Sequence, residues 1–262
     1  MVDIHTHAFA DDIAPRAIPA LLESARGELT AHYDGTIDGL VAAMDRSGVD
    51  ISVIQPVATK PGQVRAINDW AAAQASKRIV PFGAMHPELE DPAREIARMR
   101  ALGLKGFKLH PEHQSFSPSE PRLRALFEAT QDAGMIVLFH AGADVIHPTV
   151  NGTPEAFAAL IDSFPRLTVV LAHLGGFREW EGVAEHLAGR DVWLDTSYTP
   201  GHLPDDEFVA LVRAHGAHRV LFGSDGPWTD AGSEIAHLRS LPLTDAELES
   251  MLGTNARRLL ML

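Results

Sequence analysis

The residues of this 262-residue chain that most clearly indicate chemistry form the pentapeptide Asp-Ile-His-Thr-His at positions 3–7. In a strand, side chains at i and i+2 point to the same face, so His5 and His7 would lie side by side. Two imidazoles on one buried face need partners, because an unpaired buried polar group costs free energy. A divalent metal would be a partner for both rings. Alone, a His-x-His pair is more often structural, so the rest of the chain must decide.

Short apolar runs alternate with segments of helical periodicity along the chain. The runs cover residues 2–7, 50–57, 79–85, 104–110, 135–140, 168–173, 191–195 and 219–224. Continuous apolar runs are typical of strands that are buried on both faces of a parallel sheet. The clearest helical segments are 36–47, 92–102, 122–132, 205–215 and about 245–260.

This alternation predicts an α/β fold, a single-domain (β/α)8 TIM barrel over residues 1–262. A doubly wound open sheet is the alternative, but it would normally carry fewer strands and a glycine-rich nucleotide motif. Thr244 and Glu247 form a capping box, which predicts where the final helix begins. The connection at residues 8–35 is longer than the others, and we interpret it as an elaborated loop over the mouth of the barrel.

Ionisable residues stand at the ends of five of the predicted strands. They are His5 and His7, Lys108 and His110, His140, His173, and Asp225. The active site of a TIM barrel lies at the C-terminal ends of its strands, so these side chains would meet at one rim. Chance would scatter ionisable residues along the runs, and the coincidence therefore favours a metal site.

These residues resemble the amidohydrolase superfamily. Within it, the chain is most similar to the "amidohydrolase 2" group of metal-dependent hydrolases, which includes aminocarboxymuconate-semialdehyde decarboxylase and related decarboxylases and lactonases. The resemblance covers nearly the whole chain, including Lys-Gly-Phe-Lys-Leu-His-Pro at 105–111 and Leu-Gly-Thr-Asn-Ala-Arg-Arg-Leu-Leu at 252–260.

The resemblance implies one divalent ion, which four residues would bind: His5, His7, His140 and Asp225. Zinc suits such a set of nitrogen and oxygen ligands, with Mn²⁺ or Fe²⁺ as alternatives. Asp225 would also transfer a proton. His173 would act beside the metal as a general base or electrophile, not as a ligand.

Four further residues are candidates for substrate binding: Lys108, His110, Arg178 and Trp228. Arg178 would hold a carboxylate, since Arg binds carboxylates bidentately. Lys108 has two interpretations. In binuclear members of the superfamily a carbamylated lysine on this strand bridges two metals, whereas a deeper Lys108 would pair with Asp3. Asp195 is either a helix cap or an acceptor behind the site.

Composition narrows the class of partner. The net charge of −13 argues against nucleic acid and anionic membranes, so the expected partner is a small-molecule substrate. The sequence contains no apolar stretch of about 18 residues, the length that would predict a transmembrane helix. No signal peptide is recognisable either, so a cytoplasmic location is expected. Without cysteine, any metal must be held by nitrogen and oxygen. The oligomeric state is undetermined, with a homodimer as the working hypothesis.

The favoured interpretation is a metal-dependent hydrolase, in which metal-activated water attacks an ester, lactone or amide. The first alternative is a non-oxidative metal-dependent decarboxylase of an unsaturated or aromatic carboxylic acid that uses the same ligands. The second is a non-catalytic metal-binding protein. The pair of His173 and Asp225 argues against it, because binding alone would not require both beside a full ligand set.

Overall fold

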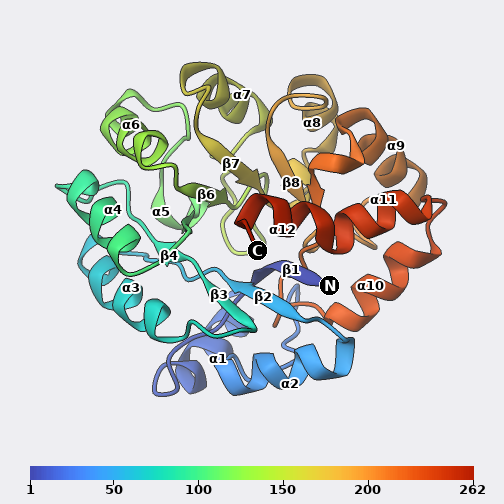
Figure 1. The fold of residues 1–262 in the computed structure, drawn as a ribbon, viewed down its shortest axis with the longest axis horizontal. Helices are drawn as coiled ribbons and strands as arrows, with labels where there is room; N and C mark the ends of the chain where they lie inside the picture. Colours follow the sequence, from blue (N-terminus) through green and yellow to red (C-terminus); the bar gives the residue numbers. More distant parts are fainter.

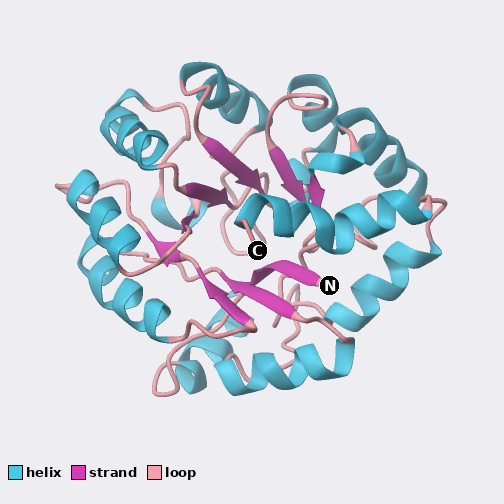
Figure 2. Cartoon of the chain, in the orientation of Figure 1, coloured by secondary structure: helices cyan, strands magenta, loops and turns pink.

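Short parallel strands surround the centre of the molecule and helices lie around them, as Figure 1 shows for the computed structural model of all 262 residues. The strands are β1 (Val2–Thr6), β2 (Ile51–Ile54), β3 (Ile79–Pro81), β4 (Gly83–Ala84), β5 (Gly106–Leu109), β6 (Ile136–Phe139), β7 (Thr168–Leu171), β8 (Trp193–Asp195) and β9 (Val220–Leu221). The alternation of strand and helix is visible in Figure 2.

The helices follow the strands in sequence. They are α1 (Ala14–Ser24), α2 (Ile37–Ser47), α3 (Val64–Ala73), α4 (Pro92–Ala101), α5 (Pro111–Gln114), α6 (Arg124–Ala133), α7 (Pro154–Ser163), α8 (Trp180–His186), α9 (Asp205–His215), α10 (Ala231–Ser240), α11 (Asp245–Glu249) and α12 (Asn255–Leu260). No helix is both long enough and apolar enough to cross a membrane.

Hydrogen bonds join the first and last strands. Parallel pairing links β1-β2-β3 in one sheet and β4 through β9 in another. The strands β3 and β4 come from one predicted run, interrupted at Phe82, whose N–H donates to the carbonyl of Ile54 at 3.1 Å. At the other edge, Ile4 N–H donates to Phe222 O and Asp225 N–H donates to His5 O, each at 2.9 Å. The chain therefore has the predicted α/β TIM-barrel fold.

The strands are buried on both faces, as their apolar runs predict. A cluster of 12 buried residues fills the interior of the ring, and it includes Val2 and Ile136, which begin β1 and β6. Helix α12 adds Ala256, Leu259 and Leu260 to this cluster and lies across the middle of the ring in Figure 1. Helix α12 thereby closes the end of the barrel at which the strands begin, so a site is expected at the opposite end, where the strands finish.

Two predicted segments differ in detail. The connection at 8–35 is not only loop, because it contains α1. Its later part does reach the C-terminal ends of the strands, where the Tyr33 hydroxyl donates to His7 O at 2.6 Å. The predicted helix at about 245–260 begins with the Thr244–Glu247 capping box, but a π-helical segment at Ser250–Thr254 divides it into α11 and α12.

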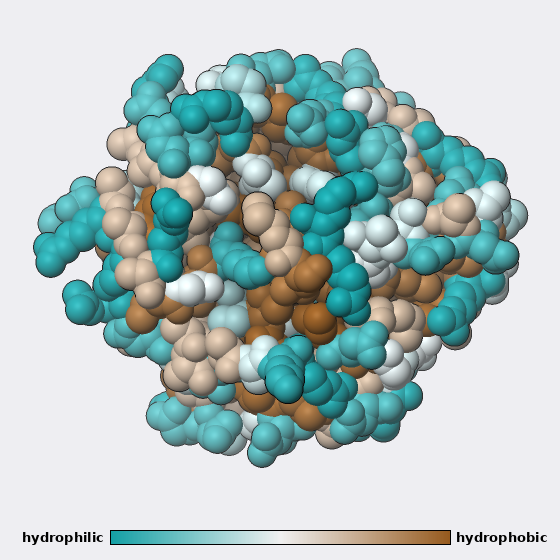
Figure 3. Space-filling model, in the orientation of Figure 1, coloured by the Kyte–Doolittle hydropathy of each residue, from teal (hydrophilic) through white to brown (hydrophobic).

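The surface agrees with the charged composition of the chain. The face in Figure 3 is mostly hydrophilic around its edge, with apolar side chains towards the middle. Only four large apolar side chains of the whole chain are exposed: Ile13, Leu102, Met261 and Leu262.

Candidate metal centre

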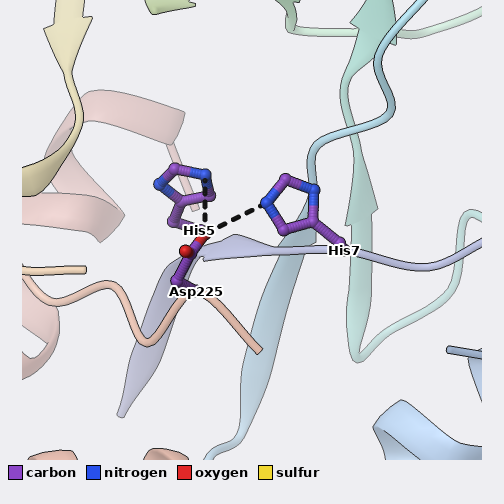
Figure 4. Close-up of side chains that lie close together, drawn as sticks. All are labelled: His5, His7 and Asp225. Atoms are coloured by element: carbon purple, nitrogen blue, oxygen red, sulfur yellow. Dashed lines mark hydrogen bonds and ion pairs between the residues drawn. The ribbon is translucent and has the colours of Figure 1, made fainter. Parts of the chain in front are cut away.

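Three predicted ligands converge at the seam between the first and last strands. His5 lies in β1, His7 directly follows it, and Asp225 lies in the loop after β9. Oδ1 of Asp225 is 3.0 Å from Nε2 of His7 and 3.3 Å from Nε2 of His5 (Figure 4). The possible ligand atoms of all three residues lie within 4.8 Å of one another. We call this group the inner metal centre.

The other ring nitrogen of each histidine is held by an acceptor. Nδ1 of His5 lies 3.0 Å from Oδ2 of Asp195, and Nδ1 of His7 lies 3.0 Å from the carbonyl oxygen of Gln55. A carbonyl or carboxylate oxygen accepts a hydrogen bond, so each Nδ1 carries the hydrogen and each Nε2 presents a lone pair to the centre. Metal-ligating histidines are held in this way. The inner metal centre therefore fits a divalent ion.

Electrostatics favour the protonation states that metal binding requires. Burial lowers the pKa of His5 well below its ordinary value, and the charge of Lys108 lowers it further. Burial alone would raise the pKa of Asp225, but His5 and His7 outweigh it and lower this pKa to about 2. The centre thus combines a neutral imidazole in His5 with an ionised carboxylate.

Lys108 belongs to this centre and does not pair with Asp3. Its Nζ lies 2.9 Å from Nε2 of His5. Asp3 instead accepts hydrogen bonds from the backbone N–H groups of His5 and Ser224, at 3.1 and 3.0 Å. The predicted ion pair is wrong, because the lysine side chain extends towards the rim while the carboxylate is used by the backbone. Burial lowers the pKa of Lys108 to about 8.

His140 and His173 form a second pair beside the first. Nε2 of His173 lies 3.0 Å from Nδ1 of His140, and the rings of His173 and His5 are 5.6 Å apart. The other ring nitrogen of each histidine lies against a backbone carbonyl oxygen. Nδ1 of His173 is 2.9 Å from Ser197 O, and Nε2 of His140 is 3.0 Å from Ala143 O. With both protons directed to these carbonyls, the two facing nitrogens need a shared cation, either a proton or a metal.

Asp195 links these groups from behind. Its Oδ2 faces His5, while its Oδ1 accepts from the backbone N–H groups of His173 (3.2 Å) and Ser197 (3.0 Å). It is fully buried at the end of β8. Of the two interpretations of Asp195 from the sequence, the structure favours the acceptor.

Backbone contacts hold the loops that carry His140 and His173 together. Phe177 N–H donates to Ala141 O and Ala143 N–H donates to Phe177 O, each at 2.8 Å. Gly142 lies between these contacts with φ +82°, and a Cβ there would lie 2.3 Å from the nitrogen of Phe177. Only glycine allows this close approach.

The remaining candidates lie around the rim. His110 stacks on His140, with ring centroids 4.1 Å apart. Trp228 is half-buried, and its backbone N–H donates to the backbone carbonyl of Asp225 at 2.9 Å. Arg178 is half exposed and pairs with Glu28 at 3.2 Å. Their roles in substrate binding stay predictions, and for Arg178 the structure adds a carboxylate partner that a substrate would have to displace.

The sequence reasoning assigned no role to Glu112 or Asp144. Oε1 of Glu112 accepts from the N–H groups of Asn151 and Gly152, at 3.0 and 2.9 Å, but its buried Oε2 has no partner. Asp144 lies in the loop after β6, close to His110 and His140. Neither residue ends an apolar run, so the strand-end pattern could not indicate them.

A parallel barrel with histidines and an aspartate at the C-terminal rim defines a metal-dependent enzyme of the amidohydrolase type. Residues 2–262 match the family model described as Amidohydrolase, and the chain belongs to this family. No curated protein matches the sequence significantly.

Solved structures with the same fold are distant in sequence. One is 5-carboxyvanillate decarboxylase from Sphingomonas paucimobilis (18% identity, TM-score 0.74, 100% of this chain and 99% of that chain). Another is an uncharacterized TIM-barrel protein from Bordetella bronchiseptica (19%, TM-score 0.78, 100% and 98%). A third is a dihydroxybenzoic acid decarboxylase from Polaromonas sp. with bound manganese and the inhibitor 2-nitroresorcinol (18%, TM-score 0.71, 100% and 96%).

Proposed function

We propose that this protein is a metal-dependent decarboxylase that removes carbon dioxide non-oxidatively from an aromatic or unsaturated carboxylic acid. The observation that carries this proposal is the inner metal centre with His173 beside it, in a fold whose solved relatives include decarboxylases of hydroxylated benzoic acids. The proposal thus prefers the reaction that the sequence analysis placed second to hydrolysis.

The metal that we propose is one divalent ion, Mn²⁺ or Zn²⁺. His5, His7 and Asp225 would hold it, with His140 as the fourth ligand that the family resemblance implies. Nδ1 of His140 supports this role, because the other ring nitrogen is held by the carbonyl of Ala143 and Nδ1 can present a lone pair. Nε2 of His173, 3.0 Å from this Nδ1, is not a ligand in this proposal. When bound, the ion would orient the acidic substrate and stabilise the negative charge that develops as carbon dioxide leaves.

The protein side chains would supply the proton. In the reaction the bond between the substrate carbon and its carboxylate breaks, the electron pair stays on that carbon, and the carbon takes up one proton. Nδ1 of His173 is held by Ser197 O, so Nε2 is the position from which His173 would deliver a proton. Asp225 would pass protons to and from this position as well as bind the metal.

Aromatic rings beside His173 support an aromatic substrate. The ring of Phe177 lies 6.1 Å from that of His173 and 5.5 Å from that of Tyr198, while Tyr198 stacks on His202 at 4.7 Å. Of these rings only His202 is exposed, and stacking of a planar ligand on it would favour an aromatic substrate over an aliphatic one.

Hydrolysis is the second candidate, and Lys108 favours it. This lysine lies on the strand that carries a carbamylated lysine in binuclear members of the superfamily, and its Nζ is 2.9 Å from a predicted ligand atom. A pKa of about 8 leaves part of the amine uncharged at neutral pH, which carbamylation requires.

Product analysis in D₂O separates the two reactions. Metal-loaded protein is incubated with hydroxybenzoic and unsaturated carboxylic acids, and in parallel with esters, lactones and amides. We expect release of carbon dioxide and one deuterium at the vacated carbon, with His173→Asn reduced by about 10²- to 10⁴-fold. Hydrolysis products without carbon dioxide would replace this proposal with the second candidate. No turnover by protein that retains its metal would favour a non-catalytic role.

A further inference from the structure

We propose that His113, Asp144 and His147 form a second site for a divalent cation, separate from the inner metal centre. We call it the outer histidine site. His113 lies in α5, and Asp144 and His147 lie in the loop after β6. The site contains none of the residues assigned to the inner ion, so this inference is independent of which reaction the enzyme catalyses.

The donor atoms are already close together. Possible ligand atoms of all three residues lie within 4.8 Å of one another, and Nδ1 of His113 is 3.0 Å from Nε2 of His147. Two nitrogens about 2.1 Å from a tetrahedral zinc ion would be roughly 3.4 Å apart. A small outward movement of the rings would therefore admit the ion, without any change in the backbone.

Local hydrogen bonds position the carboxylate. Oδ1 of Asp144 accepts from the N–H groups of Ile146 and His147, at 2.9 and 2.7 Å, which leaves Oδ2 for a ligand. His110 supports this arrangement from the other side. Nδ1 of His110 accepts a hydrogen bond from the backbone N–H of His113 at 3.4 Å, so Nε2 of His110 carries the proton. This Nε2 lies 3.8 Å from Oδ2 of Asp144. The turn thus holds the carboxylate, and His110 lies beside its free oxygen.

The charge around the site also favours a cation. Neither Asp144 nor Glu112 has a salt bridge to a lysine or arginine. The side chain of Glu112 is fully buried, and its unpartnered Oε2 faces two histidines beside the site, 3.5 Å from Nδ1 of His110 and 3.9 Å from Nε2 of His140. Burial raises the pKa of Glu112 to about 7, and a cation in the neighbouring outer histidine site would favour the ionised form of this carboxyl group.

The outer histidine site is accessible to water. A cavity of about 270 Å³ adjoins it and is lined by Glu112, Ser115, His147, Pro148, Thr149 and Asn151. Water from this cavity would complete the coordination, so the ion would exchange more readily than one at the buried inner centre. Two imidazoles and one carboxylate suit Zn²⁺ and related first-row ions better than Mg²⁺ or Ca²⁺, which prefer oxygen ligands.

Calorimetric titration of the metal-free full chain with Zn²⁺ tests the proposal. We expect two equivalents for the wild type. The double substitution His113→Ala with His147→Ala should weaken the second equivalent by about 100-fold or more and leave the first in place. His218→Ala with His237→Ala is the matched control, because these two histidines lie outside both groups. This control should retain two equivalents.

Three results would overturn the inference. The first is a single wild-type equivalent that the His113/His147 variant retains, and the second is two unchanged equivalents in that variant. The third is an equal loss in the control, which would indicate adventitious binding to surface histidines. Asp144→Asn provides a second variant if circular dichroism shows that the double variant is unfolded. Loss of the inner ion alone leaves one outer equivalent, so failure of the proposed function is distinguishable from failure of this inference.

Discussion

Oδ2 of Asp195 lies 3.0 Å from Nδ1 of His5, and this contact directs Nε2 of His5 towards Asp225. The other oxygen of the same carboxylate accepts from the N–H of His173 at 3.2 Å. One buried side chain therefore positions both a predicted ligand and the proposed proton donor. Its contribution should be visible in metal affinity even though it does not itself touch the metal.

Asp195→Asn should weaken binding of the inner ion by about 10- to 100-fold, because the amide no longer fixes the hydrogen on Nδ1 of His5. Calorimetric titration measures this affinity. Asp191→Asn is the matched control, since Asp191 lies near the same strand but is 85% exposed and pairs only with Arg219. An affinity equal to that of the wild type would contradict the positioning role.

Replacing both strand-1 histidines, His5→Ala with His7→Ala, should remove one equivalent of metal and all detectable turnover. The reason is that the variant keeps only Asp225 of the three converging ligands. Elemental analysis of dialysed protein gives the metal content. Retention of every equivalent that the wild type binds would show that the ion lies elsewhere.

Asp225→Asn should reduce turnover more than metal content. The amide keeps an oxygen where Oδ1 meets the two histidines, but it cannot transfer a proton. General acid–base groups typically contribute about 10²- to 10⁴-fold in rate, which sets the expected loss in kcat. Steady-state kinetics and metal analysis on the same sample make the comparison. Full activity in this variant would refute the proton role.

Glu234 predicts a pH dependence of stability in the metal-free protein. Burial, with Asp225 and Asp3 nearby, raises its pKa from 4.5 to about 8. Between these values the folded chain keeps a proton that the unfolded chain releases, so stability falls as the pH rises from about 4.5 to 8. Over this range the free energy of unfolding of Glu234→Gln should fall by about 1 to 3 kcal/mol less than that of the wild type. Urea denaturation at pH 5 and pH 8 tests it, and identical pH profiles for the two proteins would exclude the effect.

Gly142→Ala should lower stability and activity together. The new Cβ would meet the backbone of Phe177, and the loops that carry His140 and His173 would have to separate. Gly201→Ala is a close control, because Gly201 has φ +81° and no neighbouring atom within 4 Å. The control should cost only about 1–2 kcal/mol for its backbone conformation. Equal melting temperatures for the two variants would argue against the contact.

Much of the fold could be predicted from local pattern. Alternation in β1 places His5 and His7 on one face, and apolar runs buried on both faces identify the strands of the barrel. The position of Asp225 after the last strand then brings it to His5, because the ring closes there. These inferences needed only periodicity and the location of a TIM-barrel site at the C-terminal ends of its strands, whereas the set of metal ligands came from the family resemblance.

Loop geometry could not be predicted in the same way. The sequence pattern predicts the strand that carries Lys108, but the partner of Lys108 depends on how far its flexible side chain extends. In the structure that partner is His5 and not Asp3. Asp144 and His147 meet His113 only because the loop after β6 folds against the short helix α5. No periodic pattern in the sequence encodes such contacts between loops.

The inner metal centre spans the seam at which the barrel closes. Three of its proposed ligands are His5, His7 and Asp225, and the backbone hydrogen bond from Asp225 N–H to His5 O lies beside them. An ion bound there is available only to the closed ring, so it adds to folding stability, by about 4 kcal/mol when free metal is 1,000 times the Kd. We therefore expect metal supply to control proteolytic lifetime as well as activity, with metal-free protein cleaved faster than metal-loaded protein.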